Sequence, residues 1–391
     1  MTGPGSTHDR PRKHPMTDAR PAYARAGVDV AAGEHAVELM RASVASTRRA
    51  EVLGGLGGFG SAVAIPAGYR EPVIVSSTDG VGTKTAIAAA MGRLDTIGID
   101  LVAMCADDVA CTGAEPLAFL DYIAIGRLDP ERVAALVSGI ADGCRQAGAA
   151  LTGGETAEHP GLMEPDAFDL AGFCIGVGER SRLLDGTAAR VGDAIVGLAS
   201  SGLHANGYSL VRALVAEHGL AMEEPYATLL RRVLDGAAAD EAIARETRDA
   251  DTTLGDVLLT PTRIYARDLL GIRTDLEAAG HDVRGMAHIT GGGLPGNVPR
   301  ALPEHLGARL DPATWPMPSI MRVLGALGGM ADEELRATFN GGLGMVVVVP
   351  AEAAAATVAM VRARQIPAWV VGEVVDAASI GGRYLEEGSA R

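Results

Sequence analysis

Aromatic residues are scarce in this 391-residue chain, and the cysteines form no recognisable pair. Only 4% of the residues are aromatic although 48% are hydrophobic, so the core must be built from Ala, Val, Leu and Ile. The four cysteines lie at positions 105, 111, 144 and 174, without a CxxC pair or metal-ligand spacing. They are typical of buried thiols in a reducing compartment, although spacing alone leaves a catalytic thiol open.

The chain also lacks a long apolar run and an excess of positive charge. Its longest apolar candidate, residues 345–361, is interrupted by Pro350 and Glu352, which excludes a membrane-spanning helix there. The net charge of −15 argues against nucleic acid or an anionic membrane surface as a partner, because either would repel the protein. If the ligand is a phosphate, positive charge must come from a few local side chains or from a metal ion.

Glycine, in contrast, is abundant, with 51 residues and no collagen-like period, which favours close approach of the backbone to ligands. The length allows two or three domains. Residues 1–22 are rich in Pro, Gly and charge, which predicts a disordered tail, and they lack the apolar segment of a signal peptide. We therefore expect a soluble, cytoplasmic protein, with Met16 as an alternative start to Met1.

Residues 72–84, PVIVSSTDGVGTK, predict a strand, a glycine turn and a helix. Gly80 and Gly82 leave backbone N–H groups open to an anion, and the helix start adds partial positive charge. A carboxylate (Asp79) and an ammonium (Lys84) in one loop suit a metal-bound phosphate. A strand-to-helix turn of this kind is common, so the pattern is weak by itself.

A second glycine-rich segment, GGLGGFGS at residues 54–61, precedes this loop. It has no Lys-Ser/Thr after its glycines and is therefore not a P-loop. A mobile linker and a lid over a phosphate are both compatible with its composition.

The predicted helix over residues 95–114 begins at Asp95 and carries three further acidic residues in an apolar setting. At ~100° per residue, Asp107 falls about 20° from Asp100 on one stripe, and Asp108 lies about 80° round from it. Buried carboxylates are costly unless paired or bound to a cation, so a divalent metal shared between Asp108 and Asp79 is the favoured hypothesis. A solvated acidic face is the alternative, and for Asp100 the two remain open.

Further along, Gly153 and Gly154 predict that Glu155 stands at a strand end, where it would be a further metal or substrate ligand. A structural hairpin would use the same two glycines. The charged stretch 179–190 then indicates a domain boundary.

The second half repeats the strand, glycine turn and helix pattern. The turn after the predicted strand 193–199 offers side-chain hydrogen bonds from Ser200, Ser201, His204 and Asn206 near a helix start. A purely structural role for His204 is the alternative to an acid, base or donor facing a ligand. Residues 259–265 predict the beginning of a further helix with Pro261 in its first turn.

Three consecutive glycines, Gly291, Gly292 and Gly293, precede another predicted helix start, and residues 338–350 join a glycine turn to a buried strand. The pattern as a whole indicates a two-domain α/β (α+β) protein with a composite site. Two anionic ligands bound in one cleft favour phosphoryl transfer or ATP-driven ligation over hydride transfer.

A set of motifs in fixed order from Tyr23 nearly to the end resembles the phosphoribosylformylglycinamidine cyclo-ligase (aminoimidazole ribonucleotide synthetase) family. They are YARAGVDV, TRRAEVLGGLGGFGS, STDGVGTK, DTIGIDLVAMCADD, GAEPL, GGETAEHPG, SSGLHANGYSLVR, LTPTRIY, HITGGGLPGN and TFNGGLGM. The resemblance implies ATP and Mg²⁺, a cytoplasmic homodimer, and the substrate formylglycinamidine ribonucleotide. It implies an ATP-binding, metal-binding and dimerisation domain over residues 23–178, and a larger substrate-phosphate-binding domain over residues 179–391.

The resemblance also implies roles for individual residues. Asp79, Lys84, Asp108 and His204 would be catalytic, and metal ligands would be Asp79, Asp108 and, more weakly, Glu155. Nucleotide contacts would come from Gly54, Gly55, Gly57, Gly58, Gly60, Ser61, Gly80, Gly82, Thr83 and Lys84. Substrate contacts would come from Ser200, Ser201, His204, Asn206, Gly291, Gly292 and Gly293.

Departures from the family pattern are small. Asp107 stands where many relatives carry Asn, Leu203 where some have Pro and Arg41 where some have Lys, so Arg41 and Asp107 are left without an assigned role. A selenophosphate synthetase would carry a reactive Cys near its N-terminus, whereas no Cys precedes Cys105. A hydrogenase-maturation relative would end in Cys, and a thiamine-phosphate kinase would be shorter and lack SSGLHANGYS. A nucleotide-binding subunit without turnover is disfavoured by the presence of Asp79, Lys84 and Asp108.

Overall fold

The computed structural model describes residues 29–55, 57–246 and 248–388. The tail expected over residues 1–22 lies outside the described residues. Across the part that the structure describes, no helix is long and apolar enough to cross a membrane.

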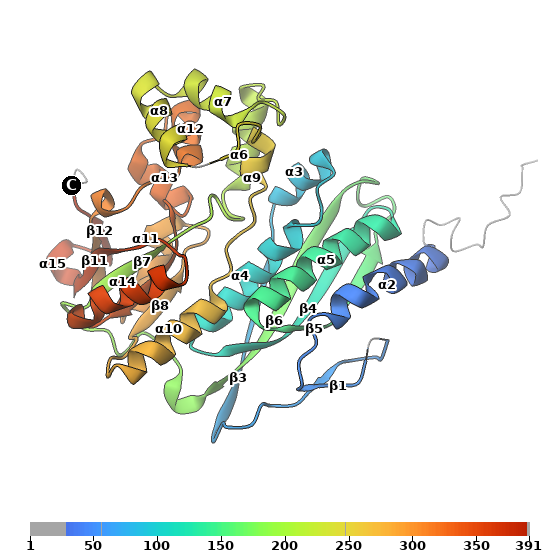
Figure 1. Cartoon of the computed structure of the whole chain (residues 1–391), viewed down its shortest axis with the longest axis horizontal. Coiled ribbons are helices and arrows are strands. Elements are labelled where there is room, and N and C mark those ends of the chain that lie inside the picture. Colours follow the sequence, from blue (N-terminus) through green and yellow to red (C-terminus); the bar gives the residue numbers. More distant parts are fainter. Residues whose placement is uncertain (1–28, 56, 247, 389–391) are drawn as a thin grey trace, which may run out of the picture.

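The first half of the chain is a four-stranded sheet with helices on one face (Figure 1). The strand order is β3-β6-β4-β5, with β4 and β5 parallel and the other neighbours antiparallel. The strands are β3 (Pro72–Gly80), β4 (Glu115–Ile125), β5 (Ala150–Glu158) and β6 (Phe168–Glu179). The helices are α2 (Val30–Ala45), α3 (Lys84–Met91), α4 (Ile97–Cys111) and α5 (Pro130–Ala147), and a short hairpin joins β1 (Val52–Leu53) to β2 (Ala62–Val63).

Helices α4 and α5 approach each other closely because glycines lie between them. A Cβ added at Gly98 would meet the backbone nitrogen of Ile140 at 2.2 Å, and one at Gly139 would meet the carbonyl oxygen of Asp95 at 2.5 Å. This close packing buries nearly all of α4. Asp100 and Asp107 are therefore held inside the molecule rather than on a solvated face, whereas the side chain of Asp108 is partly exposed.

The second half is a six-stranded sheet in the order β12-β9-β11-β7-β10-β8. Its strands are β7 (Ala194–Ala199), β8 (Gly285–His288), β9 (Leu306–Leu310), β10 (Leu343–Val349), β11 (Ala368–Asp376) and β12 (Tyr384–Glu386). Alternate residues of β10 belong to two different hydrophobic clusters, with Val346 and Val348 in one and Val347 and Val349 in the other. The strand is thus covered on both faces, as its unbroken apolar run predicts.

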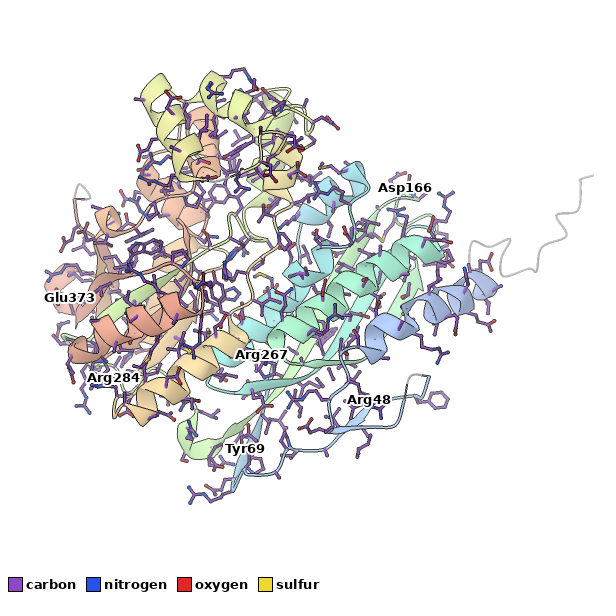
Figure 2. All side chains as sticks on the ribbon, in the orientation of Figure 1. Arg48, Tyr69, Asp166, Arg267, Arg284 and Glu373 are labelled. Carbon is purple, nitrogen blue, oxygen red and sulfur yellow. The ribbon has the colours of Figure 1, made fainter. Side chains whose placement is uncertain are left out.

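Helices surround this second sheet and connect it to the first half. Helix α10 (Ala266–Ala278) packs between α14 (Ala354–Ala363) and α4, and Arg267 at its start lies against Gly148 at the end of α5 (Figure 2). The remaining helices are α6 (Tyr208–Glu217), α7 (Tyr226–Val233), α8 (Gly236–Arg245), α9 (Leu254–Leu258), α11 (Gly293–Asn297), α12 (Ser319–Gly328), α13 (Asp332–Thr338) and α15 (Ala377–Ile380).

Two sequence-based expectations of local structure are wrong. Residues 260–265 form neither helix nor strand, and α10 begins only at Ala266, so Pro261 does not lie in a first helical turn. The backbone N–H groups of Thr262 and Tyr265 donate to carboxylates of α4, which holds the segment out of a helix. Likewise Glu155 is not at a strand end, because β5 continues to Glu158.

Candidate functional site

Two carboxylates, Asp79 and Asp108, come together where β3 ends beside α4. Burial raises the pKa of Asp79; a hydrogen bond from the Gly80 N–H (2.7 Å) opposes this shift, and the negative charge of Asp108 adds to it. A carboxylate that is held near a second one is stabilised by a cation. Mg²⁺ typically uses one or two carboxylates together with phosphate oxygens, so the pair suits a Mg²⁺-bound phosphate.

His288, at the end of β8 in the second half, faces the same pair. Its Nδ1 lies 3.1 Å from Oδ1 of Asp108. Burial lowers the pKa of His288, but the hydrogen bond to Asp108 and the charges of Asp107, Asp108 and Asp79 outweigh this and raise it overall. Its Nε2 is buried and has no hydrogen-bond partner among the described residues. His288 is the first residue of the motif HITGGGLPGN, and no role was predicted for it from the sequence.

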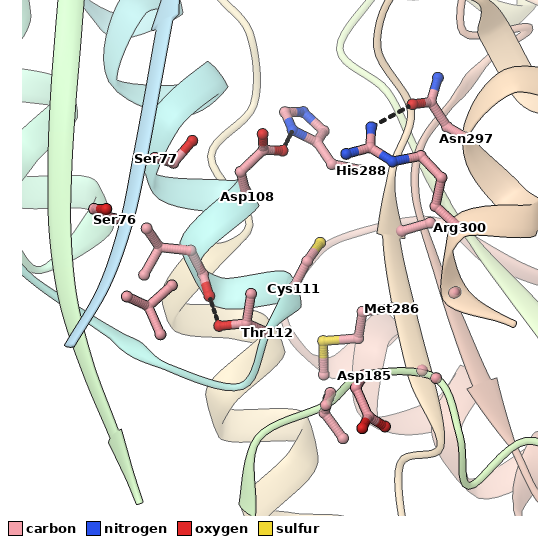
Figure 3. A pocket seen from close by; sticks show the side chains of 17 residues that line it. Ser76, Ser77, Asp108, Cys111, Thr112, Asp185, Met286, His288, Asn297 and Arg300 are labelled. Atoms are coloured by element: carbon pink, nitrogen blue, oxygen red, sulfur yellow. Dashed lines mark hydrogen bonds and ion pairs between the residues drawn. The ribbon is translucent and has the colours of Figure 1, made fainter. Parts of the chain in front are cut away.

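A cavity of about 310 Å³ opens beside this dyad, between β3, α4 and β8 (Figure 3). Its polar wall includes Ser76 and Ser77 of β3, Asp108, His288 and Arg300. Arg300 is exposed and the histidine carries a raised pKa, so both signs of charge meet in one cavity. Such a site can hold a ligand that carries a phosphate and polar groups.

The three-glycine turn, residues 291–293, lies next to this cavity and is organised by Asn297. The Asn297 side-chain amide donates to the carbonyl oxygens of Gly291 (3.1 Å) and Gly293 (2.8 Å), and its Oδ1 accepts from Arg300 (3.1 Å). Gly292 and Gly293 have φ of +87° and +60°, which glycine adopts without strain. One amide therefore determines the shape of the loop and the position of the arginine.

The predicted substrate turn at residues 200–206 is also assembled. The Ser201 hydroxyl donates to the carbonyl of Pro261 (2.7 Å) and accepts from the N–H of Arg263 (3.0 Å), while the Ser200 hydroxyl donates to the Gly202 carbonyl (2.9 Å). Asn206 faces the three-glycine turn, because a Cβ at Gly291 would lie 3.5 Å from its Oδ1. The structure therefore brings these two predicted substrate segments together.

His204 is more deeply placed than a ligand-facing residue. Its exposed fraction is 1%, its φ is +62°, and burial holds its pKa well below the usual range. Its Nε2 accepts a hydrogen bond from the Ser201 N–H (3.1 Å), so in the neutral ring the proton is on Nδ1. Nδ1 has no partner among the described residues and remains a buried donor.

Lys84 does not point into a cavity. Its exposed fraction is 0%, and its Nζ donates to Oδ1 of Asp100 (2.8 Å) and to the carbonyls of His204 (3.0 Å) and Thr260 (2.8 Å). Burial lowers the pKa of Lys84 and raises that of Asp100, and each charge opposes the shift of the other. All three ammonium donors are used within the protein, so no donor is left for the nucleotide phosphate that the sequence suggested.

Asp100 and Asp107 both accept hydrogen bonds from the segment that precedes α10. Asp100 accepts from the Thr262 N–H (2.9 Å) and hydroxyl (2.5 Å), and Asp107 accepts from the Tyr265 N–H (2.8 Å). Burial raises the pKa of Asp107 to about 7. These carboxylates tie the first half to the segment before α10, and Asp108 alone of the three faces the cavity.

The predicted nucleotide residues lie at opposite edges of the first sheet. Gly80, Gly82 and Thr83 form the turn after β3, where the Thr83 hydroxyl lies 3.5 Å from that of Ser209. The glycine-rich segment instead borders β5, with the Ser61 hydroxyl 3.2 Å from that of Thr152. The structure does not bring the two parts together within one chain.

Two neighbouring cavities lie beneath the glycine-rich segment. The larger, about 680 Å³, is bordered by α2, β5 and the residues Gly55, Gly57, Gly58, Phe59, Gly60 and Ser61. The smaller, about 180 Å³, is lined by Arg41, Arg48, Gly54, Gly55 and Ser61. Gly55 and Ser61 are common to both, so a single elongated ligand could occupy the two.

Glu155 lines the larger cavity and is separated from the Asp79–Asp108 pair. Strands β3 and β5 are three steps apart in the sheet, which is roughly 14 Å at the usual strand spacing. Among the described residues no group of three or more His, Cys, Asp or Glu side chains is arranged to hold a metal ion. The three predicted ligands are therefore not assembled into one site within this chain.

One cysteine, Cys111, lines the cavity beside the Asp79–Asp108 pair. All four are free, and burial raises the pKa of each thiol, that of Cys174 to about 12. A thiol with a raised pKa is a poor nucleophile. The geometry thus favours the core role of the two alternatives that spacing left open.

Comparison with known proteins places both halves in one family. The model of the AIR synthase related protein N-terminal domain matches residues 62–178, and that of the C-terminal domain matches residues 190–384. A protein of Geobacillus kaustophilus named phosphoribosylformylglycinamidine cyclo-ligase is 49% identical over 368 residues, covering 93% of this chain and 99% of the relative. One of the same name from Thermosynechococcus vestitus is 50% identical, covering 90% and 96%.

Solved structures share the fold. The hydrogenase maturation protein HypE in complex with ATP superimposes with a TM-score of 0.60 at 16% identity, covering 91% of each chain. Thiamine-monophosphate kinase from Stenotrophomonas maltophilia gives a TM-score of 0.56 at 17% identity, covering 91% of this chain and 97% of the other. At such low sequence identity, the likeness to these two structures supports the α/β, two-domain fold alone. The family matches cover most of the sequence, and the chain belongs to the AIR synthase related protein family.

Proposed function

We propose that this chain catalyses the ATP-dependent cyclisation of formylglycinamidine ribonucleotide to 5-aminoimidazole ribonucleotide, with release of ADP and phosphate, in purine biosynthesis. The observation that carries the proposal is the 49–50% identity to proteins named phosphoribosylformylglycinamidine cyclo-ligase, which spans at least 96% of those relatives. The cavity between the two halves, with its acidic pair, His288 and Arg300, is chemically suited to such a substrate.

The reaction has two balanced steps. The formyl oxygen of the substrate attacks the terminal phosphorus of ATP, and the bond to ADP breaks. The ribose-bearing amidine nitrogen then attacks the activated carbon, the carbon–oxygen bond breaks, phosphate leaves and the nitrogen loses its proton. Phosphorylation is needed because an amide-like oxygen is otherwise a poor leaving group.

The residues of the chain divide between binding and orientation. Asp79 and Asp108 would hold Mg²⁺, which supplies positive charge to the phosphates. Arg300 and the backbone of Gly291–Gly293 would bind the substrate phosphate, and Ser200, Ser201 and Asn206 would shape the neighbouring wall. His204 would orient the turn, because its buried, neutral ring accepts a hydrogen bond from the Ser201 N–H.

We assign the nucleotide to the glycine-rich segment. Because this segment lies at the opposite edge of the first sheet from Asp79 and Asp108, the nucleotide phosphates would reach that pair in the second copy of the proposed homodimer. Lys84 takes a different role from a phosphate contact. Gly54 to Ser61 and the adjacent arginines Arg41 and Arg48 supply N–H donors and positive charge for phosphates. Lys84 would act as a positioning residue, because its ammonium holds the His204 carbonyl. Glu155, on the nucleotide side, would bind a cation only together with the ligand.

The homodimer, the domain division and the cytoplasmic location belong to the same proposal. One face of the first sheet carries exposed apolar side chains, Ile74 (55%) and Phe173 (44%), which suits pairing with a second copy. Strand β6 ends at Glu179 and β7 begins at Ala194, which supports domains at 23–178 and 179–391. The four unpaired thiols suit a reducing compartment.

The proposal is tested with the purified protein, ATP, MgCl₂ and formylglycinamidine ribonucleotide. We expect ADP release that depends on the substrate, together with formation of aminoimidazole ribonucleotide detected as its coloured diazo derivative. ATP hydrolysis that is independent of the substrate, with no imidazole product, would contradict the proposal.

A further inference from the structure

A buried carboxylate without a protein partner lies in the wall of the larger cavity. Asp121 of β4 is 8% exposed. It has no hydrogen bond or ion pair with any other residue that the structure describes, and burial is the only cause of its raised pKa, about 7. An unpaired buried carboxylate costs several kcal/mol unless it is protonated or finds a donor.

The backbone around Asp121 leaves space for its side chain in the cavity. Asp121 pairs in the sheet with Gly154 of β5 and Gly172 of β6. A Cβ at Gly154 would lie 1.8 Å from Oδ1 of Asp121, and Gly154 itself lines the cavity. Any other residue at position 154 would displace the carboxylate, so the two residues form one feature.

The chemistry of the walls indicates which part of a nucleotide fits here. The large cavity is lined mainly by apolar side chains, among them Met40 of α2, Val137 of α5 and Leu151 of β5. Among its described lining residues there is no Lys or Arg, whereas the smaller adjoining cavity has Arg41 and Arg48. A flat ring system is favoured in the first and phosphates in the second.

We propose that Asp121 accepts a hydrogen bond from the exocyclic amino group of the adenine ring, and that the large cavity is the base subsite of the nucleotide. The inference rests on the proposed use of ATP and adds the residue that recognises the base. The amino group supplies the hydrogen-bond donor that Asp121 lacks among the described residues, and the apolar walls bury the ring. The glycine-rich segment and the two arginines then face the phosphates.

The test couples one residue to one ligand group. Dissociation constants are measured by calorimetry for ATP, for purine riboside 5′-triphosphate, which lacks the amino group, and for 2′-deoxy-ATP. In the wild-type protein, loss of the amino group should weaken binding about 10- to 100-fold, the range for a hydrogen bond to a charged group. The ratio of the dissociation constant for purine riboside 5′-triphosphate to that for ATP should fall to about 1 in Asp121→Ala, because the hydrogen-bond acceptor is gone.

Asp121→Asn keeps an acceptor oxygen of the same shape and should retain most of the ratio, which also controls for folding. Asp142→Ala, an exposed position on α5, should leave it unchanged. A ratio that is equal in the wild type and in Asp121→Ala would overturn the proposal. It would also be overturned if Asp121→Ala changed the effect of removing the 2′-hydroxyl, measured with 2′-deoxy-ATP, and not that of removing the amino group. Absence of ATP binding by the wild type would overturn it as well. The cyclisation assay of the wild type reports on the proposed function separately.

Discussion

Lys84 illustrates at the residue scale how burial changes the meaning of a motif. The chain has only two lysines, Lys13 and Lys84, beside 32 arginines. At position 84 a compact ammonium reaches three acceptors on three different segments, Asp100, His204 and Thr260, which a planar guanidinium would not match. The residue joins the two halves directly under the substrate turn.

We predict that Lys84→Met destabilises the protein by about 3–5 kcal/mol, because it leaves Asp100 buried and unpaired. Chemical denaturation measures the change, and adding Asp100→Asn in the same chain should recover part of it. A Lys84→Met protein with wild-type stability but greatly weakened ATP binding would instead support a phosphate contact.

A second residue-scale prediction concerns Asp121 and pH. Its folded pKa, about 7, lies above its unfolded value of 3.8. The folded state therefore holds a proton that the unfolded state has lost between these values, and stability falls as pH rises from about 4 to 7. Asp121→Asn removes this loss, so its stability advantage over the wild type should grow by about 2–3 kcal/mol from pH 5 to pH 8. Equal advantages at both pH values would show that Asp121 titrates normally.

Asp108 is the acidic residue of α4 that we assign to Mg²⁺. Asp108→Asn should lower kcat at least about 100-fold and raise the Mg²⁺ concentration needed for half-maximal activity, since one charged ligand is lost. Steady-state kinetics over a Mg²⁺ titration measures both. The exposed Asp142→Asn serves as a matched control, and unchanged Mg²⁺ dependence in Asp108→Asn would remove Asp108 from the metal site.

At the scale of elements, the site depends on short segments that are kept out of regular structure by side-chain hydrogen bonds. Residues 260–265 stay irregular because Asp100 and Asp107 accept hydrogen bonds from the N–H groups of Thr262 and Tyr265. The three-glycine turn before α11 is held by the amide of Asn297. In both cases polar side chains replace the hydrogen bonds that a helix or sheet would supply.

We therefore predict that Asn297→Ala raises the KM for formylglycinamidine ribonucleotide about 10- to 100-fold, because the turn and Arg300 lose their common anchor. The KM for ATP should change little, since the glycine-rich segment lies at the far edge of the first sheet. Equal increases in both KM values would point to a general loss of structure, which circular dichroism and thermal unfolding would detect.

For the whole molecule, the first sheet has helices on one face, whereas its other face exposes Ile74 and Phe173. Exposed apolar side chains on an uncovered sheet face are compatible with an interface. The proposed homodimer would bury this face and would complete the covering of the sheet.

We predict that the double substitution Ile74→Asp, Phe173→Asp converts the dimer to a monomer, as measured by sedimentation velocity. The control is Leu162→Asp, in the turn before β6, where an exposed leucine (85%) lies outside the sheet. A wild-type protein that sediments as a monomer would contradict the proposed dimer, and a double variant that stays dimeric would move the interface elsewhere.

Much of the fold was predictable from local pattern. The apolar run of β10, the capped helix α5 and the strand β3, which ends at Gly80, each contain their own signals of period, cap and turn. The family was predictable as well, because its motifs are contiguous stretches of sequence. Glycine turns also marked the substrate segments, since they need no distant partner to be recognised.

Only the tertiary structure decided which polar side chains face a ligand. Asp100, Asp107 and Asp108 are neighbours on one helix, yet two of them bind backbone N–H groups from a segment more than 150 residues away, and the third faces a cavity. Lys84 is buried for the same reason, and Asp121 lies in a cavity because Gly154 of the next strand has no side chain. Burial and pairing depend on contacts between segments distant in the chain, which local pattern does not encode.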